Sequence, residues 1–378
     1  MRMATETIPI ATDDPVNAKI LSVSEDKILG FHRNPIREIA DQSDVPIDDV
    51  VKRIRAMLEG GTIRRVRQTL MATNLAPGAL VAWRVSEDRL NEIFDWMFQQ
   101  DPFSGHVVIR TTDEGKTGAR YRLWTTVKVP LPYSMDKHCE LLCEKTGAEV
   151  FRLMPAKSIF ALGVGHVRRR SMEPGSKSDE PAMPRHVEVV ELSDLDWQVM
   201  MGLKREFEME EIQDDPWVQR AEEAGLSLDQ FCEVAEDLQS RKVVGRFSTF
   251  LEHSKRLKTG ERVTRYNALF HWAVAKGREI EAGCEVGRHD IMTHCYWREG
   301  GPEFGDVNIM GVVHGMEREK VFEHKQAIDD HLAFCDIPIS YTNVFWGGRS
   351  EIKPSEISPS VYREWCASMG VDAEEMKG

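Results

Sequence analysis

The sequence of 378 residues lacks any run of about 18 apolar residues, which is roughly the length needed to cross a membrane. Its first 15 residues are polar and contain no hydrophobic core of the kind that a signal peptide carries. From these two absences we expect a cytoplasmic protein without a membrane partner.

Cysteine patterns typical of disulfide frameworks or zinc ribbons are also missing. The seven cysteines are odd in number and form no C-x-x-C motif. Cys139 and Cys143 stand one helical turn apart, so two metal ligands could share that face. Because no second pair follows nearby, ordinary helix packing is the favoured interpretation, and no metal site is predicted.

Positive charge is in deficit. Lys and Arg number 49 against 62 Asp and Glu, which gives a formal net charge of -13. Such a chain repels a phosphate backbone unless its cations gather in one patch, so generic nucleic-acid binding is disfavoured. With 41% hydrophobic residues the chain is long enough for two or more domains with real cores.

The same order of elements occurs twice. Residues 168–188 are rich in Arg, Ser and Pro, which is typical of an exposed linker between two halves. In the first half, apolar spacing predicts helices and then a strand at 18–30, 35–42, 47–58 and 62–70. In the second half, the equivalent segments are 193–207, 217–225, 227–239 and 243–251. Three helices and a β wing are the pattern of a winged helix-turn-helix.

Downstream of each wing, strand and helix patterns alternate as β-α-β-β-α-β. In the first half they cover 79–85, 86–100, 105–111, 121–129, 134–146 and 150–160. In the second half they cover 267–274, 275–284, 291–298, 307–314, 317–334 and 339–346. This order is that of a ferredoxin-like sheet with two helices on one face.

The sequence therefore predicts an α+β fold, a tandem repeat of a winged helix-turn-helix plus a ferredoxin-like (βαββαβ) domain. The expected parts are winged helix 1 at 16–72, ferredoxin-like domain 1 at 76–167, a linker at 168–190, winged helix 2 at 191–255, ferredoxin-like domain 2 at 264–348 and a C-terminal tail at 349–378. The tail is polar and acidic, with one helical stretch near 361–369 and no readable role.

This arrangement resembles two fused subunits of the leucine-responsive (Lrp/AsnC) type of bacterial regulator. In that family the ferredoxin-like domains pair across subunits and bind small molecules. The resemblance implies an intramolecular pseudo-dimer, and it leaves further homo-oligomers open.

The predicted reading helices carry few groups suited to DNA. Residues 47–58 hold two aspartates beside three cations, and residues 227–239 are acidic without any cation. A reading helix needs side chains that reach base edges and cations that reach phosphates, so DNA binding is disfavoured. A DNA-binding Lrp/AsnC-type regulator stays the alternative on the strength of Lys52, Arg53, Arg55, Arg64, Arg65 and Arg67.

One predicted strand concentrates chemical groups. In residues 293–298 (THCYWR), His294, Tyr296 and Arg298 share one face, because side chains two apart on a strand point the same way. Cys295 points to the other face and is expected in the core on the helix side. The first half has His106 and Arg110 at the matching places and the same spacing. Recurrence at equivalent positions of a repeat favours a shared functional origin.

These residues resemble more narrowly the siroheme decarboxylases of haem d1 and alternative haem biosynthesis. Their second ferredoxin-like strand typically reads S-H-x-Y-x-R, which residues 293–298 fit. Their next strand runs from W-P-Y-N-L to H-G, and 308–315 (NIMGVVHG) fit its later part, whereas 305–307 (GDV) replace W-P-Y. In the first half, 121–124 (YRLW) resemble Y-N-L-W, and Lys128 stands where the final His would be.

Further matches extend the resemblance over most of the chain up to about Trp346. Residues 61–65 (GTIRR) resemble the wing motif G-x-I-R-R; Arg246-Phe247, His253 and 267–272 resemble the R-F, H and N-x-x-x-x-W positions. The sequence departs from the pattern where Val108 replaces the motif Tyr, where the last strand lacks Y-S-x-x-E-F-K-K, and in the tail.

The resemblance implies a carboxy-lyase that converts siroheme acetate side chains to methyls, giving 12,18-didecarboxysiroheme, with no cofactor beyond its iron tetrapyrrole substrate. Arg298 and Arg110 are candidate carboxylate clamps, because a guanidinium pairs bidentately with a carboxylate. His294 is the first candidate for the catalytic acid and His106 the second, since a histidine titrates near neutral pH. Tyr296 would hold the substrate or relay the proton. Candidate substrate-binding residues are Tyr121, Lys128, Arg64, Arg246, Asn308 and His314.

Three of these candidates have plain structural interpretations. His314 ends a predicted strand and could be a surface histidine, and Arg64 and Arg246 could be wing surface charges. A non-catalytic tetrapyrrole-binding protein that keeps the pocket and lacks turnover is a further alternative to the enzyme.

Overall fold

A computed structural model describes residues 8–71, 75–163, 165, 169, 171–186, 190–251 and 264–378. The chain divides into two compact units, which are treated separately below. Unit 1 comprises Met1–Met71, Val164–Ser171 and Val190–Arg265, and unit 2 comprises Ala72–Gly163, Met172–Val189 and Tyr266–Gly378. Among the described helices none is long and apolar enough to span a membrane.

Unit 1 contains both predicted winged helices. The first consists of α1 (Pro15–Ser24), α2 (Pro35–Ser43), α3 (Ile47–Gly60) and β1 (Ile63–Leu70). The second consists of α7 (Asp194–Lys204), α8 (Val218–Glu223), α9 (Leu228–Ser240) and β8 (Val244–Leu251). Capping boxes at Ser193 and Ser227 begin α7 and α9, as a serine followed by an acid or amide three residues later predicts.

The first helix differs from its prediction at 18–30. It begins at Pro15, because the Asp14 carboxylate accepts hydrogen bonds from the backbone N–H groups of Val16 and Asn17. It ends at Ser24, and Leu29 forms an isolated bridge with Arg246 of the other winged helix. The apolar spacing beyond Ser24 therefore belongs to a loop that packs, not to further helix.

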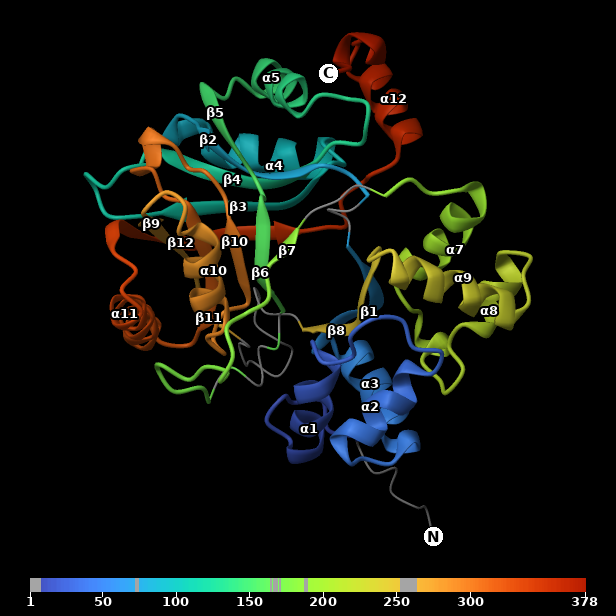
Figure 1. The fold of residues 1–378 in the computed structure, drawn as a ribbon. Coiled ribbons are helices and arrows are strands. Elements are labelled where there is room, and N and C mark those ends of the chain that lie inside the picture. Colours follow the sequence, from blue (N-terminus) through green and yellow to red (C-terminus); the bar gives the residue numbers. More distant parts are fainter. Residues whose placement is uncertain are drawn as a thin grey trace. The chain divides into compact units, whose positions relative to one another are not determined.

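The two wings complete each other. β1 and β8 form a two-stranded antiparallel sheet in which Val66 lies opposite Thr249, and Figure 1 shows the two strands side by side. Among the described residues each winged helix supplies one strand, and the two strands pair with each other. Pairing satisfies backbone groups that a single exposed strand would leave to solvent.

Unit 2 contains two ferredoxin-like modules, whose elements are labelled in Figure 1. Module 1 consists of β2 (Gly78–Arg84), α4 (Leu90–Gln100), β3 (Ser104–Thr111), β4 (Tyr121–Lys128), α5 (Met135–Thr146) and β5 (Val150–Pro155), with a 3-10 turn, η2 (Glu87–Arg89), before α4. Module 2 consists of β9 (Tyr266–Val274), α10 (Glu279–Gly287), β10 (His294–Trp297), β11 (Ile309–Gly315), α11 (Arg318–Phe334) and β12 (Ile339–Ile352). The predicted tandem fold is thereby confirmed.

The modules share one sheet of ten strands in the order β5-β2-β4-β3-β12-β9-β11-β10-β6-β7. Within it each module keeps the ferredoxin-like order, with its fourth strand beside its first. β12 is longer than predicted: its first part pairs with β9, and Trp346 to Ile352 pair with β3 of module 1. The last strand of module 2 therefore extends the sheet of module 1.

Module 1 makes the equivalent connection through a break in its own last strand. The single strand predicted at 150–160 is two strands, β5 and β6 (Ser158–Leu162). β5 pairs with β2, whereas β6 pairs with β10 of module 2. Pro155 lies at the break, and a proline cannot donate a backbone hydrogen bond to a ladder.

Two cores of unit 2 lie beneath helices. In module 1, Trp83, Val107 and Leu123 pack against residues of α4 and α5. In module 2, Phe270, Trp272 and Cys295 pack against residues of α10 and α11. Burial of these alternate strand residues is what the strand period of two predicts.

A third core joins the two modules. It contains Ala82, Val108 and Trp124 from module 1 with Leu269 and Phe345 from module 2. These residues alternate along the strands with those that face the helices, so they define the face of the sheet turned away from the helices, called here the inner face. The functional candidates on β3, β10 and β11 fall on this face.

The C-terminal tail is packed against module 1. Its helix α12 (Pro359–Ser368) places Tyr362 and Trp365 against Phe103, in the same core as α4 and α5. The rings of Tyr362 and Tyr133 stack at a centroid distance of 4.2 Å. The predicted helix near 361–369 thus exists, and its apolar residues cover module 1.

The linker region makes ordered contacts at several points. β7 (Arg185–His186) pairs with β6, Lys177 bridges His289, and Arg288 holds the carbonyl oxygen of Ser178 at 2.9 Å. The division into six parts made from the sequence stays a prediction, since contacts group the chain only as the two units.

His271 supplies a pH-dependent contribution to stability. Its ring is fully buried between the modules, and burial first, then the positive Arg110, lowers its pKa from 6.5 to about 3. Below about pH 6.5, His271 binds a proton in the unfolded chain, whereas in the folded chain its ring stays neutral down to about pH 3. The contribution is therefore complete above pH 6.5 and falls as the pH decreases, by about 2 kcal/mol between pH 7 and pH 5.

We expect the loss of unfolding free energy between pH 7 and pH 5 to be smaller in His271→Phe than in wild type by that amount. Urea unfolding at the two pH values measures it. His186→Phe, at an exposed histidine, is the control and should retain the wild-type slope. Equal slopes in His271→Phe and wild type would contradict the assignment.

Candidate functional site

The column of three side chains predicted on β10 exists. The rings of His294 and Tyr296 are stacked at 6.2 Å, with 20° between their planes. The guanidinium carbon of Arg298 lies 4.5 Å above the Tyr296 ring. Cys295 points the other way, is fully buried among residues of α10, and its thiol lies 3.9 Å from the carbonyl oxygen of Gly283. The strand parity inferred from the sequence is therefore confirmed.

A hydrogen-bond network connects this column to the neighbouring strands. Arg110 donates from Nη1 to Asn267 Oδ1 at 3.1 Å, and Asn267 Nδ2 lies 3.1 Å from His314 Nε2. His314 Nδ1 lies 3.4 Å from the hydroxyl of Thr293, which lies 3.2 Å from His294 Nδ1. Three predicted residues, Arg110, His314 and His294, thus meet in one network, and Arg110 enters it from the other module.

The donors and acceptors of this network determine how its histidines are protonated. The Thr293 hydroxyl donates to the carbonyl oxygen of Val312 at 2.8 Å, so toward the two imidazoles it accepts. His314 and His294 then carry their protons on Nδ1. The Asn267 amide donates to His314 Nε2, which agrees with this assignment.

Gly347 explains how Arg110 reaches across the sheet. It lies opposite Arg110 in the β12–β3 pair, between the strands that carry Arg110 and Asn267. A side chain there would place its Cβ 3.2 Å from Asn267 Cβ, closer than usual contact. Sequence patterns alone do not single out Asn267, Thr293 or Gly347 as functional residues. The N-x-x-x-x-W match contained Asn267, but a role for it required the pairing of β9 with β11.

A second group of cations lies on the inner face. Lys128 from module 1 is close enough to Arg298 from module 2 for their charges to interact. Burial first, and then Arg298, lowers the pKa of Lys128 to about 8. Burial lowers the pKa of Arg298 to about 10, and its Nη1 donates to the carbonyl oxygen of Met154. Both modules therefore contribute to this end of the inner face as well.

These cations have no acidic partners in the part of the chain that the structure describes. Arg110 and Arg298 are only 4% and 8% exposed, and burial lowers the pKa of Arg110 to about 10. Within the described residues, no carboxylate forms an ion pair with Arg110, Arg298 or Lys128. Buried charges in folded proteins are normally paired, because an uncompensated buried charge is costly. The inner face is thus electrostatically suited to a ligand with several carboxylates.

The other predicted residues of unit 2 lie apart from the His294 network. The His106 ring lies 2.8 Å from the Ser350 hydroxyl on β12. Tyr121 packs against Phe304 in the core between the modules. The side-chain amide of Asn308 accepts a hydrogen bond from the backbone N–H of Val274 and donates one to its carbonyl oxygen. These two bonds fix the end of β9. The contacts described for Tyr121 and Asn308 stabilise the fold, and none of them involves His294.

Arg64 and Arg246 lie in unit 1 on the paired wings. Together with Arg65 they surround Arg67, whose pKa is lowered to about 10 by burial first and then by these positive neighbours. Glu206 pairs with Arg65 at 2.8 Å. The two predicted residues thus belong to one arginine cluster. His253 lies outside the described residues.

The first cysteine pair is part of a core. Cys139 is fully buried and Cys143 packs beside it beneath the sheet of module 1. Burial raises the pKa of the Cys139 thiol well above its ordinary value. Both cysteines therefore pack from their helix into the core, which is the interpretation that their spacing favoured.

Comparisons with known proteins agree with these features. Residues 76–161 match the family model of the AsnC-like ligand-binding domain. The NirH subunit of siroheme decarboxylase from Stutzerimonas stutzeri is 26% identical over 117 residues. That match covers 30% of this chain, and it spans 64% of the relative's length.

Two solved structures share the fold. The crystal structure of the siroheme decarboxylase NirDL superposes with a TM-score of 0.64 and 17% identity, covering 93% of this chain and 99% of that one. The same decarboxylase in co-complex with an iron-uroporphyrin III analogue superposes with a TM-score of 0.63 and 17% identity. That match covers 94% of this chain and 99% of the other chain. The resemblance predicted from the motifs is confirmed: the chain carries an AsnC-like ligand-binding domain and is similar to the siroheme decarboxylases, in sequence to one subunit and in fold over nearly its whole length.

Proposed function

We propose that this protein is a siroheme decarboxylase, a carboxy-lyase that converts the C12 and C18 acetates of siroheme to methyls in haem d1 or alternative haem biosynthesis. The observation that carries the proposal is the inner face itself. It combines Arg110, Arg298 and Lys128, which have no acidic partners among the described residues, with a histidine whose orientation is set by hydrogen bonds. The tetrapyrrole named in the complex of a structural relative is a molecule with many carboxylates.

The residues of the inner face suit a reaction that releases CO2 and takes up one proton. The arginines pair with carboxylates of the substrate and orient the macrocycle. When the bond between the acetate methylene and its carboxylate breaks, the electron pair stays on the methylene carbon and spreads into the conjugated ring. His294 donates a proton to that carbon, and the methylene becomes a methyl. Water restores the proton on His294, so no oxidant or reductant is consumed.

Tyr296 lies between His294 and Arg298 on the same strand face. It stands one strand repeat of two residues from the proton donor on one side and from the carboxylate clamp on the other. The ring packs against both neighbours and holds them in line along the strand. Module 1 has Val108 at the equivalent place, so the proposal assigns catalysis to the site around His294.

The direct test mixes purified protein with siroheme under anaerobic conditions and identifies the product by mass spectrometry. The expected product, 12,18-didecarboxysiroheme, has lost two CO2. Unchanged siroheme under both reducing and oxidising conditions contradicts the proposal. A spectral shift with siroheme and no product would instead support the non-catalytic tetrapyrrole-binding alternative.

The regulator alternative is weakened by contacts within unit 1. Arg53 donates from Nη1 to the Asp14 carboxylate at 2.6 Å and to the Asn17 amide oxygen at 2.9 Å. Arg55 donates from Nε to the carbonyl oxygen of Ile212 at 3.1 Å. These cations of α3 are engaged within the protein. Salt-sensitive, sub-micromolar binding to a promoter fragment, abolished by charge reversal at Arg53 and Arg55, would favour the regulator.

Replacing Arg298 by methionine should have opposite effects on stability and on binding. A shift of its pKa from 12.5 to about 10 corresponds to about 3 kcal/mol of unfavourable burial of the charge. We therefore expect Arg298→Met to raise the unfolding free energy of the unliganded protein by about 1–3 kcal/mol. Loss of a charged hydrogen bond should weaken siroheme binding about 10–100-fold.

Urea unfolding and absorbance titration with siroheme measure the two effects. Arg84→Met is the matched control, since Arg84 is half exposed and paired with Glu149 on the surface. It should change both quantities little. An Arg298→Met protein that is less stable and binds siroheme as tightly as wild type would contradict the assignment of Arg298 to the substrate.

A further inference from the structure

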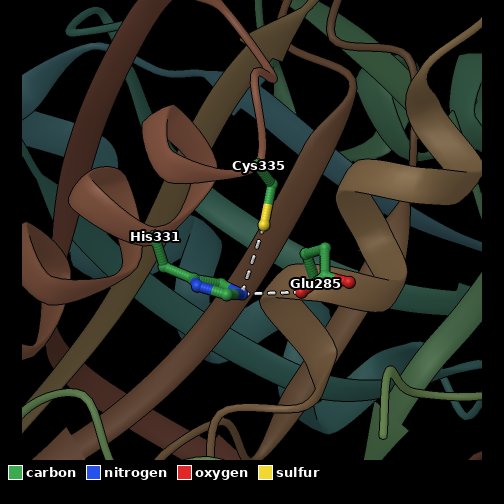
Figure 2. A group of neighbouring side chains, drawn as sticks. All are labelled: Glu285, His331 and Cys335. Atoms are coloured by element: carbon green, nitrogen blue, oxygen red, sulfur yellow. Dashed lines mark hydrogen bonds and ion pairs between the residues drawn. The ribbon is translucent and has the colours of Figure 1, made fainter.

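Three potential metal ligands meet between α10 and α11, on the helical side of module 2 (Figure 2). The Nε2 atom of His331 lies 2.6 Å from Glu285 Oε2 and 3.7 Å from Cys335 Sγ. The ligand atoms of all three lie within 4.8 Å of one another. One nitrogen, one oxygen and one sulfur donor are thus gathered in one place. The nitrogen and the oxygen are hydrogen-bonded to each other, and they would separate to about 3.3 Å to bind one tetrahedral ion.

A fourth donor lies beside them. The His289 ring packs edge-on against His331, with centroids 5.2 Å apart and 73° between the planes. His289 is only 2% exposed, and its Nε2 is buried with no hydrogen-bond partner among the described residues. Buried polar nitrogens are usually satisfied, so an orphan imidazole nitrogen next to a ready set of ligands requires an explanation. A metal ion supplies one.

The four residues come from the ends of two adjacent helices. Glu285 lies on α10 and His331 on α11, and His289 and Cys335 follow four positions later, just beyond the ends of these helices. His289 stands beside the group of three, and its ring has to turn toward Glu285 and His331 to ligate the same ion. The cluster is also separate from the inner face, because Cys295, which follows His294, packs against α10 from the opposite side of the sheet.

The donor set selects the kind of ion. A thiolate and imidazoles favour zinc or a similar transition metal, whereas calcium and magnesium prefer oxygen ligands alone. Arg288 also contacts Glu285 Oε2, at 3.0 Å, and thus shares the carboxylate. The second carboxylate oxygen and the three other residues remain to complete a tetrahedral set.

We propose that Glu285, His289, His331 and Cys335 form a structural zinc site that fastens α10 to α11. Four protein ligands would close the coordination shell, which is the arrangement of structural rather than catalytic zinc. The ion would stabilise the helical layer that supports β10 from behind. This site is independent of the decarboxylase proposal, since none of its residues lies on the inner face.

The test uses the full chain, freed of metal with a chelator and titrated with Zn2+ against a chromophoric zinc indicator. We expect one zinc per chain, a Tm that rises on zinc addition, and a thiolate-to-metal charge-transfer band when Co2+ is substituted. Cys335→Ser should weaken zinc binding by more than the ~10–100-fold that loss of an outer partner costs, and should abolish that band. His289→Ala should weaken binding at least 10-fold.

Cys143→Ser is the matched control, because Cys143 is a partly buried helix cysteine in the other module. It should bind zinc as wild type does. The metal-free Tm of Cys335→Ser should equal that of metal-free wild type, which separates loss of a ligand from misfolding. Absence of stoichiometric zinc in wild type overturns the proposal, as does wild-type zinc affinity in Cys335→Ser. Wild-type affinity in His289→Ala overturns the four-ligand set.

Discussion

Replacing His294 by alanine is expected to lower the rate of siroheme decarboxylation about 10²–10⁴-fold, the usual contribution of a positioned general acid. The affinity for siroheme should change little, because Arg110, Arg298 and Lys128 remain in place to bind carboxylates. Thr293 contacts Nδ1 of the imidazole and orients it, so the alanine variant loses a positioned proton donor. The rate under single-turnover conditions and a spectroscopic binding titration measure the two quantities separately.

Two companion variants sharpen this test. Thr293→Val keeps the acid and removes the hydroxyl that orients it, so its rate should lie between those of wild type and His294→Ala. His186→Ala, at an exposed histidine on β7, is the control and should turn over as wild type. Added imidazole should partly restore the rate of His294→Ala. If His294→Ala binds siroheme and turns over at the wild-type rate, His294 is not the acid.

The largest loss of stability is expected from Arg220→Ala in unit 1. Arg220 is 1% exposed and donates from Nε and Nη2 to the two carboxylate oxygens of Glu211, at 2.9 and 3.0 Å. It also donates to three backbone carbonyl oxygens, and its guanidinium carbon lies 3.7 Å above the Phe207 ring. Every donor of the guanidinium is therefore used inside the second winged helix.

Removal of this side chain leaves Glu211, itself 3% exposed, without its main counter-charge. Breaking a buried pair in this way typically costs about 3–5 kcal/mol. Urea unfolding followed by far-UV circular dichroism should show that loss. Arg33→Ala is the control: its ion pair with Asp229 is exposed, so its loss should cost at most about 1 kcal/mol. A cost below about 1 kcal/mol for Arg220→Ala would contradict the role assigned to the pair.

The elements themselves could be predicted because their signals are local. Apolar periodicity placed α2, α3 and α9 within a few residues, and for α9 the capping box at Ser227 agrees with it. The crossing of β12 into module 1 and the break at Pro155 could not be predicted in the same way. Which strand a segment pairs with depends on residues far away in the sequence, and β3 and β12 are separated by more than two hundred positions.

The same distinction applies to the candidate site. Strand parity predicted the column His294, Tyr296, Arg298 because it depends on neighbouring residues alone. The network from Arg110 to His294 passes through Asn267 on a strand from another part of the chain, so no spacing in the sequence reveals it. Arg220 was likewise not selected, since nothing local distinguishes it from an exposed arginine. Its role comes from the fold of the loop around Glu211.

The exchange of last strands between the modules has a consequence for assembly. Each ferredoxin-like module presents an edge that only the other completes, through β6 on β10 and through β12 on β3. Two separate chains would have to find each other by diffusion, whereas in a single chain the two halves meet at a local concentration that does not depend on the amount of protein present. Folding then no longer depends on how much of the protein the cell makes. Covalent linkage can thus keep the two modules together even though the interface between them contains buried charges that lower stability.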